Sequence, residues 1–309
     1  MTLHQLKSVT IGVPNVEQTR SYYNEFGLTP ESDGWLSTID GGRQLCLVPA
    51  VLRRLVSLTV GVDGPDDLAR IAERLDRGNL PHHQPSADRL VSFDPVTTTE
   101  VELEVTPRLQ QPAVSATRYN GPGRLERIQA RAPGVLRTEA VRPRKLGHVV
   151  LGTVNFDASY QYFVDVLGFK VSDLVKGAGA FLRCSTDHHN LLLLSAPVSF
   201  LHHTSWQVDD IDEIGRGATA MLEDHPERHV WGLGRHHIGS NFFWYLKDPA
   251  GNFSEYYSDL DCVIDDQLWS AETFEGARGL FNWGPPPPPS FLHPDDLADL
   301  MSGAHSEVR

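Results

Sequence analysis

Cysteine and long apolar runs are both scarce in this sequence. Its 309 residues include only three cysteines, Cys46, Cys184 and Cys262. Because they are odd in number and widely spaced, they exclude a disulfide framework and argue against a cysteine-based zinc site. No apolar run reaches the roughly 18–20 residues of a membrane span, and residues 1–25 lack the apolar core of a signal peptide. We therefore expect a cytoplasmic protein without a membrane partner.

Positive charge is also in short supply, whereas histidine is abundant. The chain has 27 lysines and arginines against 40 aspartates and glutamates, a net charge of −13. Binding to a phosphate backbone needs clustered basic side chains, so we expect no nucleic-acid partner. Nine of the 14 histidines lie between His148 and His237, so the surplus is local.

The sequence repeats itself in outline. Residues 6–28 and 146–169 each combine an alternating β-branched stretch, a turn with Asn, and a short amphipathic segment that ends at a glycine. Residues 55–76 and 201–223 each read as a strand followed by a helix, and hairpin signals built on Asp-Pro follow both. The chain therefore holds four βαβββ-like modules, two in each half.

These repeats predict an α+β protein of two domains, each with two βαβββ modules that form a curved mixed sheet. We expect a non-catalytic N-terminal domain over residues 1–110, a linker over 111–143 and a metal-binding C-terminal domain over 144–260. Residues 261–309 form a tail with five consecutive prolines. Since proline cannot donate a hydrogen bond to a ladder, we expect the tail to pack on the C-terminal domain without continuing a sheet.

Three potential metal ligands of the C-terminal half align with residues of the N-terminal half that are not typical metal ligands. Alignment of the repeats and of the Asp-Pro turns pairs His148 with Ser8, His203 with Ser57, and Glu255 with Val101. Two imidazoles and one carboxylate are typical ligands of Fe(II) in non-haem oxygenases, and Zn(II) accepts the same set. The long spacing requires three strands to converge on one cavity, so the pattern predicts a metal site in the C-terminal half.

Four segments of the C-terminal half carry a family resemblance. They are LGHVVLGTVNFDASYQYFVDVLGFKVSD, FLRCSTDHHNLLLL, FLHHTSWQVDDID and GRHHIGSNFFWYLKDPAGNFSEYY. Together they resemble the type I extradiol ring-cleavage dioxygenases (catechol 2,3-dioxygenases and dihydroxybiphenyl dioxygenases) of the vicinal oxygen chelate superfamily. The string Y-x-x-D-P-x-G-N-x-x-E, from Tyr245 to Glu255, is the most diagnostic. The resemblance implies the vicinal oxygen chelate (glyoxalase-like) fold.

The resemblance also implies roles for individual residues. The metal ligands would be His148, His203 and Glu255. The residues that shape the substrate pocket would be Val150 and Phe181. The catalytic residues would be His189, His236 and Tyr245, of which the last two would also bind substrate.

Strand alternation leaves the phase of each histidine pair open, because neighbouring side chains on a strand point to opposite faces. In the pair at 202–203 the repeat selects His203, so we expect His202 to support or pack. His188 competes with His189, and His237 with His236. The spacing of the family motif favours His189 over His188.

The resemblance implies an oxidoreductase that uses Fe(II), or Mn(II), and O2. It would cleave a catechol in the extradiol (meta) position to a 2-hydroxymuconic semialdehyde-type product, in aromatic catabolism. Arg183 and Arg235 are the candidates for binding a carboxylated substrate, but surface positions suit them better. We therefore expect a neutral catechol with an apolar substituent, and a homo-oligomer as in the family.

Three other functions are compatible with parts of the pattern. A 4-hydroxyphenylpyruvate dioxygenase-like iron oxygenase would have no obvious use for His189, His236 and Tyr245 together. A glyoxalase-type isomerase would place metal ligands in both halves. A ligand-sequestering protein similar to the bleomycin-binding proteins would need no metal ligands at all.

Overall fold

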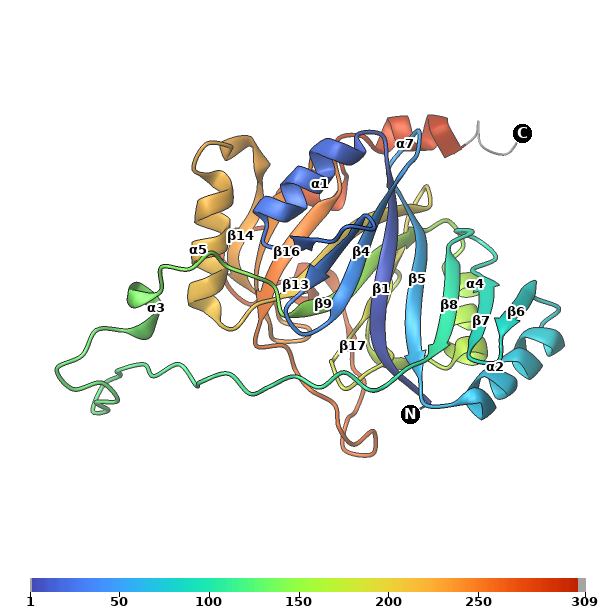
Figure 1. The fold of residues 1–309 in the computed structure, drawn as a ribbon, viewed down its shortest axis with the longest axis horizontal. Helices are drawn as coiled ribbons and strands as arrows, with labels where there is room; N and C mark the ends of the chain where they lie inside the picture. The colour runs from blue at the N-terminus through green and yellow to red at the C-terminus, as the bar shows by residue number, and fades with distance from the viewer. Residues whose placement is uncertain (1, 305–309) are drawn as a thin grey trace.

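The computed structural model describes residues 2–304 and consists of two mixed β-sheets with helices on their outer faces (Figure 1). The N-terminal half contains β1 (Leu3–Val13), α1 (Val16–Glu25), β2 (Thr29–Pro30), β3 (Trp35–Thr38), β4 (Gly42–Pro49), β5 (Arg54–Val62), α2 (Pro65–Arg77), β6 (His82–Ser86), β7 (Arg89–Phe93) and β8 (Glu100–Val105). Its strand order is β2-β3-β4-β1-β5-β8-β7-β6, so its two modules meet where β1 pairs with β5.

The C-terminal half repeats this arrangement. It contains β9 (Lys145–Thr153), α4 (Phe156–Gln161), the π-helical turn η1 (Tyr162–Leu167), β10 (Lys170–Val175), β11 (Gly179–Arg183), β12 (Leu191–Ser195), β13 (Phe200–Gln207), α5 (Ile211–Leu222), the 3₁₀ turn η2 (Pro226–Arg228), β14 (His229–Arg235), β15 (Phe242–Lys247) and β16 (Phe253–Ser258). The strand order is β14-β15-β16-β13-β9-β12-β11-β10-β17. The predicted α+β class and the four βαβββ modules are confirmed.

The remaining elements lie in the connecting segment and the tail. They are α3 (Pro133–Leu136), β17 (Thr273–Phe274), the 3₁₀ turn η3 (Gly276–Gly279), α6 (Pro289–Leu292) and α7 (Leu297–Ala304). The expectation that the tail adds no strand is wrong, because β17 pairs in parallel with Leu174 and Val175 at the edge of the sheet. The proline run begins only at residue 285, so the preceding stretch keeps its backbone donors. None of the helices in the described chain is both long and apolar enough to cross a bilayer.

One predicted equivalence between the halves is wrong. In the strand registers, the partner of Glu255 across the duplication is Glu102 and not Val101. The turn that starts at Asp94 is one residue longer than the turn that starts at Asp248, which shifts the following strand by one position. A one-residue shift exchanges the two faces of a strand, so Val101 lies buried in the core. The N-terminal half therefore differs from the C-terminal half chiefly in lacking the two histidines.

The two halves exchange their first helices. Helix α1 of the N-terminal half lies over β16 of the other sheet, and α4 lies behind β7 and β8 (Figure 1). The ring of Phe26, at the end of α1, stacks on Tyr256 with centroids 3.8 Å apart, and the Tyr256 hydroxyl donates to the Phe26 carbonyl at 2.6 Å. In the other direction, the Ser159 hydroxyl of α4 donates to the Asp94 carboxylate at 3.0 Å. Each sheet is therefore covered partly by the other half.

The tail is held against the N-terminal half by an ion pair between the buried Arg53 and the partly exposed Asp296. Arg53 is only 3% exposed and donates from Nε and Nη2 to the two carboxylate oxygens of Asp296, at 2.6 and 2.9 Å. The same guanidinium also donates to the Leu201 carbonyl of β13. Because a buried arginine needs such partners, this contact fixes residues near 296 against both sheets.

We predict that Phe26→Ala destabilises both halves together. Removal of a fully buried aromatic ring leaves a cavity and costs about 3–5 kcal/mol, and the ring serves the helix of one half and the sheet of the other. Chemical unfolding followed by circular dichroism should show one transition at lower denaturant. Val51→Ala, at an 81% exposed position, should leave the transition in place. Two transitions, of which only one shifts, would contradict the shared core.

Candidate functional site

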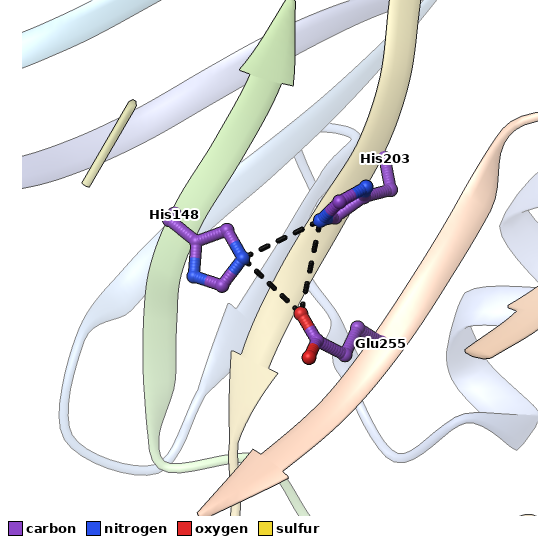
Figure 2. A group of neighbouring side chains, drawn as sticks. All are labelled: His148, His203 and Glu255. Atoms are coloured by element: carbon purple, nitrogen blue, oxygen red, sulfur yellow. Dashed lines mark hydrogen bonds and ion pairs between the residues drawn. The ribbon is translucent and has the colours of Figure 1, made fainter. Parts of the chain in front are cut away.

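Three neighbouring strands bring His148, His203 and Glu255 together (Figure 2). His148 lies on β9, His203 on β13 and Glu255 on β16, and all three side chains are buried. The two Nε2 atoms are 3.4 Å apart, and Glu255 Oε2 lies 3.1 Å from His148 Nε2 and 3.8 Å from His203 Nε2. Their ligand atoms all lie within 4.8 Å of one another.

The Glu255 carboxylate has an incomplete set of partners. Its Oε1 accepts a hydrogen bond from Asn241 Nδ2 at 3.2 Å, whereas Oε2 has no hydrogen bond of normal geometry although it is fully buried. Burial alone would raise the pKa of Glu255, but the neighbouring His148 and His236 outweigh it and hold that pKa well below its usual range. A buried anion with an unpartnered oxygen beside two imidazole nitrogens fits a divalent metal.

The orientation of His203 is set by a chain of two further groups. His202 Nε2 lies 2.6 Å from the Phe291 carbonyl, which can only accept, so this nitrogen carries the proton. The Nδ1 of His202 then accepts from Nδ1 of His203 at 2.7 Å. The lone pair of His203 is therefore left on Nε2, which points to Glu255 and is the atom that a metal would bind.

The expectation that His202 and His203 point to opposite faces is wrong. Both rings line the same cavity and touch each other. The ladder between β13 and β9 shifts its register between Leu201 and His203, which is a β-bulge. A bulge interrupts the alternation of side chains and re-aims one of them, so the two rings share a face.

A second histidine pair repeats this arrangement. His188 Nε2 donates to Asp173 Oδ2 at 3.0 Å, and His188 Nδ1 lies 3.0 Å from Nδ1 of His189. If the ring of His189 donates from Nδ1, its Nε2 is free toward the cavity, where the ring centroid lies 4.2 Å from that of His148. Burial, reinforced by the neighbouring histidines, holds the pKa of His189 well below its usual range, so the ring is neutral. His188 is fully buried and points away from the cavity.

His236 and Tyr245 complete the polar side of the site. His236 Nδ1 donates to the Leu280 carbonyl at 2.5 Å, which leaves Nε2 to accept from the Tyr245 hydroxyl at 2.9 Å. Burial raises the pKa of Tyr245 well above its usual value, so the hydroxyl keeps its proton. His237, which competes with His236 in the sequence, is exposed, and the neighbour of Tyr245, Trp244, donates from its indole nitrogen to His229 Nδ1.

These groups open into a cavity of about 170 Å³. Val150 and Phe181 both line it, as do Leu192, Leu194 and Phe200. The tail supplies another wall, made of Gly279, Leu280, Phe291, Leu292, His293, Pro294 and Leu297. No lysine, arginine, aspartate or glutamate is among the described residues that line the cavity, so it suits an uncharged ligand.

Several supporting groups were not predicted from the sequence. Asp173 and Asn241 give no local signal, because neither belongs to a motif. The carbonyls of Leu280 and Phe291 are backbone groups of the tail, which sequence patterns do not reveal. The run of histidine pairs was the available signal, since a histidine beside a ligand can orient it.

Comparison with known proteins finds a family match in the second half of the chain. Residues 145–256 match the model described as Glyoxalase/Bleomycin resistance protein/Dioxygenase superfamily. Metapyrocatechase 2 from Cupriavidus necator is 34% identical over 209 residues, which cover 65% of this chain and 62% of that protein. The chain therefore matches somewhat less than two thirds of the length of that relative.

Two solved structures match almost the whole chain. The Mn(II)-bound glyoxalase from Novosphingobium aromaticivorans is 25% identical, with a TM-score of 0.74 and coverage of 95% of each chain. The 2,2',3-trihydroxybiphenyl 1,2-dioxygenase from Sphingomonas wittichii RW1 is 20% identical, with a TM-score of 0.70 and coverage of 91% of this chain and 98% of that one, which shows a common fold. Residues 145–256 are thus similar to the Glyoxalase/Bleomycin resistance protein/Dioxygenase superfamily, and the chain has the vicinal oxygen chelate fold.

Proposed function

We propose that this protein is an extradiol ring-cleavage dioxygenase that opens a catechol with O2. The observation that carries the proposal is the arrangement of His189, His236 and Tyr245 around the group of His148, His203 and Glu255. A neutral imidazole, an oriented imidazole and a protonated phenol then surround one small, mostly apolar cavity. The similarity to a metapyrocatechase supports the same reaction.

The three ligand residues would hold a divalent metal, which we propose to be Fe(II), with Mn(II) as the alternative. When bound, the metal supplies the Lewis acidity that lowers the pKa of a coordinated hydroxyl and the redox chemistry that O2 requires. The phenol of Tyr245 and Nε2 of His236 can hold or take up a proton at a substrate oxygen. His189 Nε2 can accept a proton and return it to an oxygen atom of the reacting substrate as the ring opens.

The cavity favours a neutral catechol with an apolar substituent. Its far side is made of Leu192, Leu194 and Phe200. Neither arginine considered for a carboxylated substrate is free, because Arg183 pairs with Asp266 and Arg235 with Asp259. An apolar lining also limits water around reactive intermediates.

A glyoxalase-type isomerase is the second candidate, favoured by the similarity of the whole chain to a Mn(II)-bound glyoxalase. Such a reaction consumes no O2. In the N-terminal half, Ser8 and Ser57 replace the histidines, and Glu102 pairs with Arg89. The halves are therefore unequal, which suits a single site in the C-terminal half.

We predict that protein loaded anaerobically with Fe(II) takes up one molecule of O2 for each molecule of 3-methylcatechol, with a yellow product. An oxygen electrode and visible absorbance measure this directly. Protein that binds metal but takes up no O2 would contradict ring cleavage and favour the isomerase.

We predict that Glu255→Gln abolishes tight metal binding. The substitution removes the anion from a buried set of two imidazoles, and we expect affinity to fall about 100-fold or more. Equilibrium dialysis against Fe(II) and Mn(II) measures this without reference to turnover. Glu102→Gln changes the equivalent position of the N-terminal half and is the matched control, which should bind as the wild type does. Equal loss in both variants would argue against the site.

We predict that His189→Phe lowers kcat by about 100-fold or more, as expected for loss of an acid–base group, while metal affinity is unchanged. Asp173→Asn should lower kcat by about tenfold, because it frees the His188 ring that orients His189. Steady-state kinetics and metal binding separate the two effects. If kcat were unchanged in His189→Phe and strongly lowered in His188→Phe, the acid–base group would be His188.

We predict that an added carboxylate on the substrate weakens binding. The lining offers no cation to pair with it, so a catechol with a ring carboxylate should have a KM about tenfold or more above that of 3-methylcatechol. Comparison of KM and kcat for the two compounds tests this. A lower KM for the charged compound would contradict an apolar substituent pocket.

A further inference from the structure

A loop of the connecting segment exposes apolar side chains outside both sheets. We call residues 118–131 the arginine loop. Leu125 and Ile128 on this loop are each 74% exposed, and Tyr119 is 46% exposed. Figure 1 shows this part of the chain running out beyond α5, away from the body of the molecule. Exposed apolar side chains that cluster on one projecting segment mark an interaction surface.

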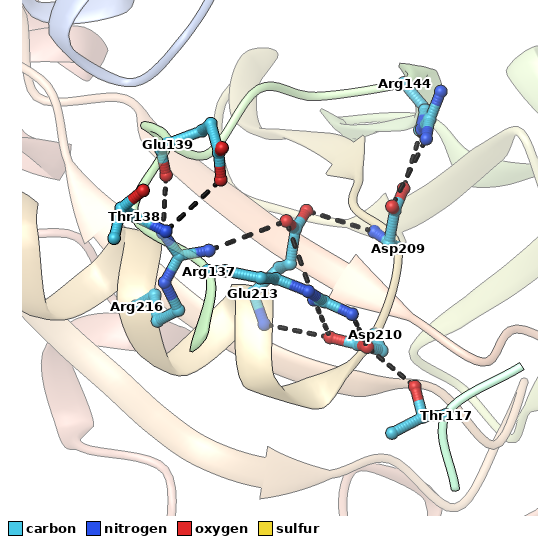
Figure 3. A network of polar contacts seen from close by, with 9 residues as sticks. All are labelled: Thr117, Arg137, Thr138, Glu139, Arg144, Asp209, Asp210, Glu213 and Arg216. Atoms are coloured by element: carbon cyan, nitrogen blue, oxygen red, sulfur yellow. Dashed lines mark hydrogen bonds and ion pairs between the residues drawn. The ribbon is translucent and has the colours of Figure 1, made fainter. Parts of the chain in front are cut away.

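The arginine loop is held at both of its ends by one residue. Asp210, the N-cap of α5, accepts from the Thr117 hydroxyl at 2.7 Å and from the guanidinium of Arg137 at 2.9 and 2.7 Å (Figure 3). Within the loop, Asn120 accepts from the backbone N–H of Arg127 at 2.8 Å. The loop therefore leaves the body from a fixed base at the start of α5.

The charge of the arginine loop is opposite to that of the chain. It carries four arginines and one glutamate, whereas the chain has a net charge of −13. Arg118 and Arg131 are exposed and form no ion pair with any residue from 2 to 304. Arg124 lies 3.7 Å from Glu126, but both side chains are largely exposed, so this pair contributes little.

A groove of about 770 Å³ beside α5 has the complementary character. Its floor is apolar and includes Ala220, Leu233 and Tyr256, together with glycines of α5. Asp212 and Glu223 lie along it and pair with no cation in the described part of the chain. The arginine loop does not line this groove in its own chain, although residues just after it do.

We propose that the arginine loop binds the α5 groove of a second copy of this chain. Leu125 and Ile128 would cover the apolar floor, while Arg118 and Arg131 would face Asp212 and Glu223. Loop and groove lie at the same end of the molecule, because the loop starts at the N-cap of α5. A two-fold axis there brings each loop to the groove of the other protomer, which gives a closed dimer with the same contact made twice. This surface is separate from the cavity and does not depend on the proposed reaction.

The experiment uses the full chain and reverses charges on each side of the contact. Sedimentation velocity over a range of concentrations should find a dimer for the wild type. The loop variant Arg118→Glu/Arg131→Glu and the groove variant Asp212→Asn/Glu223→Lys should each raise the dissociation constant by about 100-fold or more, because each places like charges together. An equimolar mixture of the two variants should form a heterodimer, since every loop then meets a groove of opposite charge.

An apolar pair of variants tests the floor of the groove. Leu125→Asp/Ile128→Asp should dissociate the dimer, and Val51→Asp, which alters an 81% exposed position elsewhere, should not. Circular dichroism should show every variant folded, with thermal midpoints close to that of the wild type. A monomeric wild type at all concentrations, or variants that stay dimeric, would overturn the proposal. Failure of the loop variant and the groove variant to form a heterodimer would also overturn it. So would loop variants that remain dimeric and lose only binding to a single-stranded oligonucleotide, because the loop would then be a nucleic-acid contact.

Discussion

Strand β16 packs against the other half through one face and supplies the buried carboxylate of the site from its opposite face. The rest of the structure depends on both contacts. On the outer face, Tyr256 stacks on Phe26 of a helix that belongs to the other half. On the inner face, the adjacent Glu255 keeps a buried carboxylate beside two imidazoles. A buried charge costs free energy unless its partners are held in place, and the aromatic stack fixes the strand that carries it. Core packing and site geometry therefore depend on one another across the halves.

The acceptor groups behind the site histidines decide which nitrogen of each ring carries the proton. The carbonyls of Phe291 and Leu280 each receive an imidazole proton and so decide which nitrogen of His202 and of His236 keeps a lone pair. For His188, the Asp173 carboxylate has the same part. An imidazole that donates a hydrogen bond from one ring nitrogen keeps a lone pair on its other nitrogen, as is usual for histidines around metals. The tail is thus part of the polar framework as well as a wall.

Much of the fold could be predicted because a repeat is visible in a single sequence. Alternation and turn residues indicated four βαβββ modules, and the histidines of one half stood out against the serines of the other. The position of Glu255 in the alignment depended on the length of one turn, and a turn that is longer by a single residue moved the apparent counterpart from Glu102 to Val101.

Other features could not be predicted, because they arise from tertiary contacts. Nothing in residues 16–25 indicates that this helix covers the other half, since its apolar face would suit either sheet equally. The bulge at His202 depends on how β13 pairs with β9, and strand alternation is a good guide only where pairing is regular. The contacts of Arg53 with Asp296 and Leu201 join segments that are far apart in sequence.

The walls of the cavity have a consequence for the order in which the protein matures. The ligand residues end at position 255, but Phe291 and Leu297 are needed to close the cavity and to orient His202. Synthesis proceeds from the N-terminus, so a nascent chain that has already folded both sheets still has an open, water-filled site. Residues that are synthesised after those of the two sheets therefore decide when this chain first excludes water from its reactive groups.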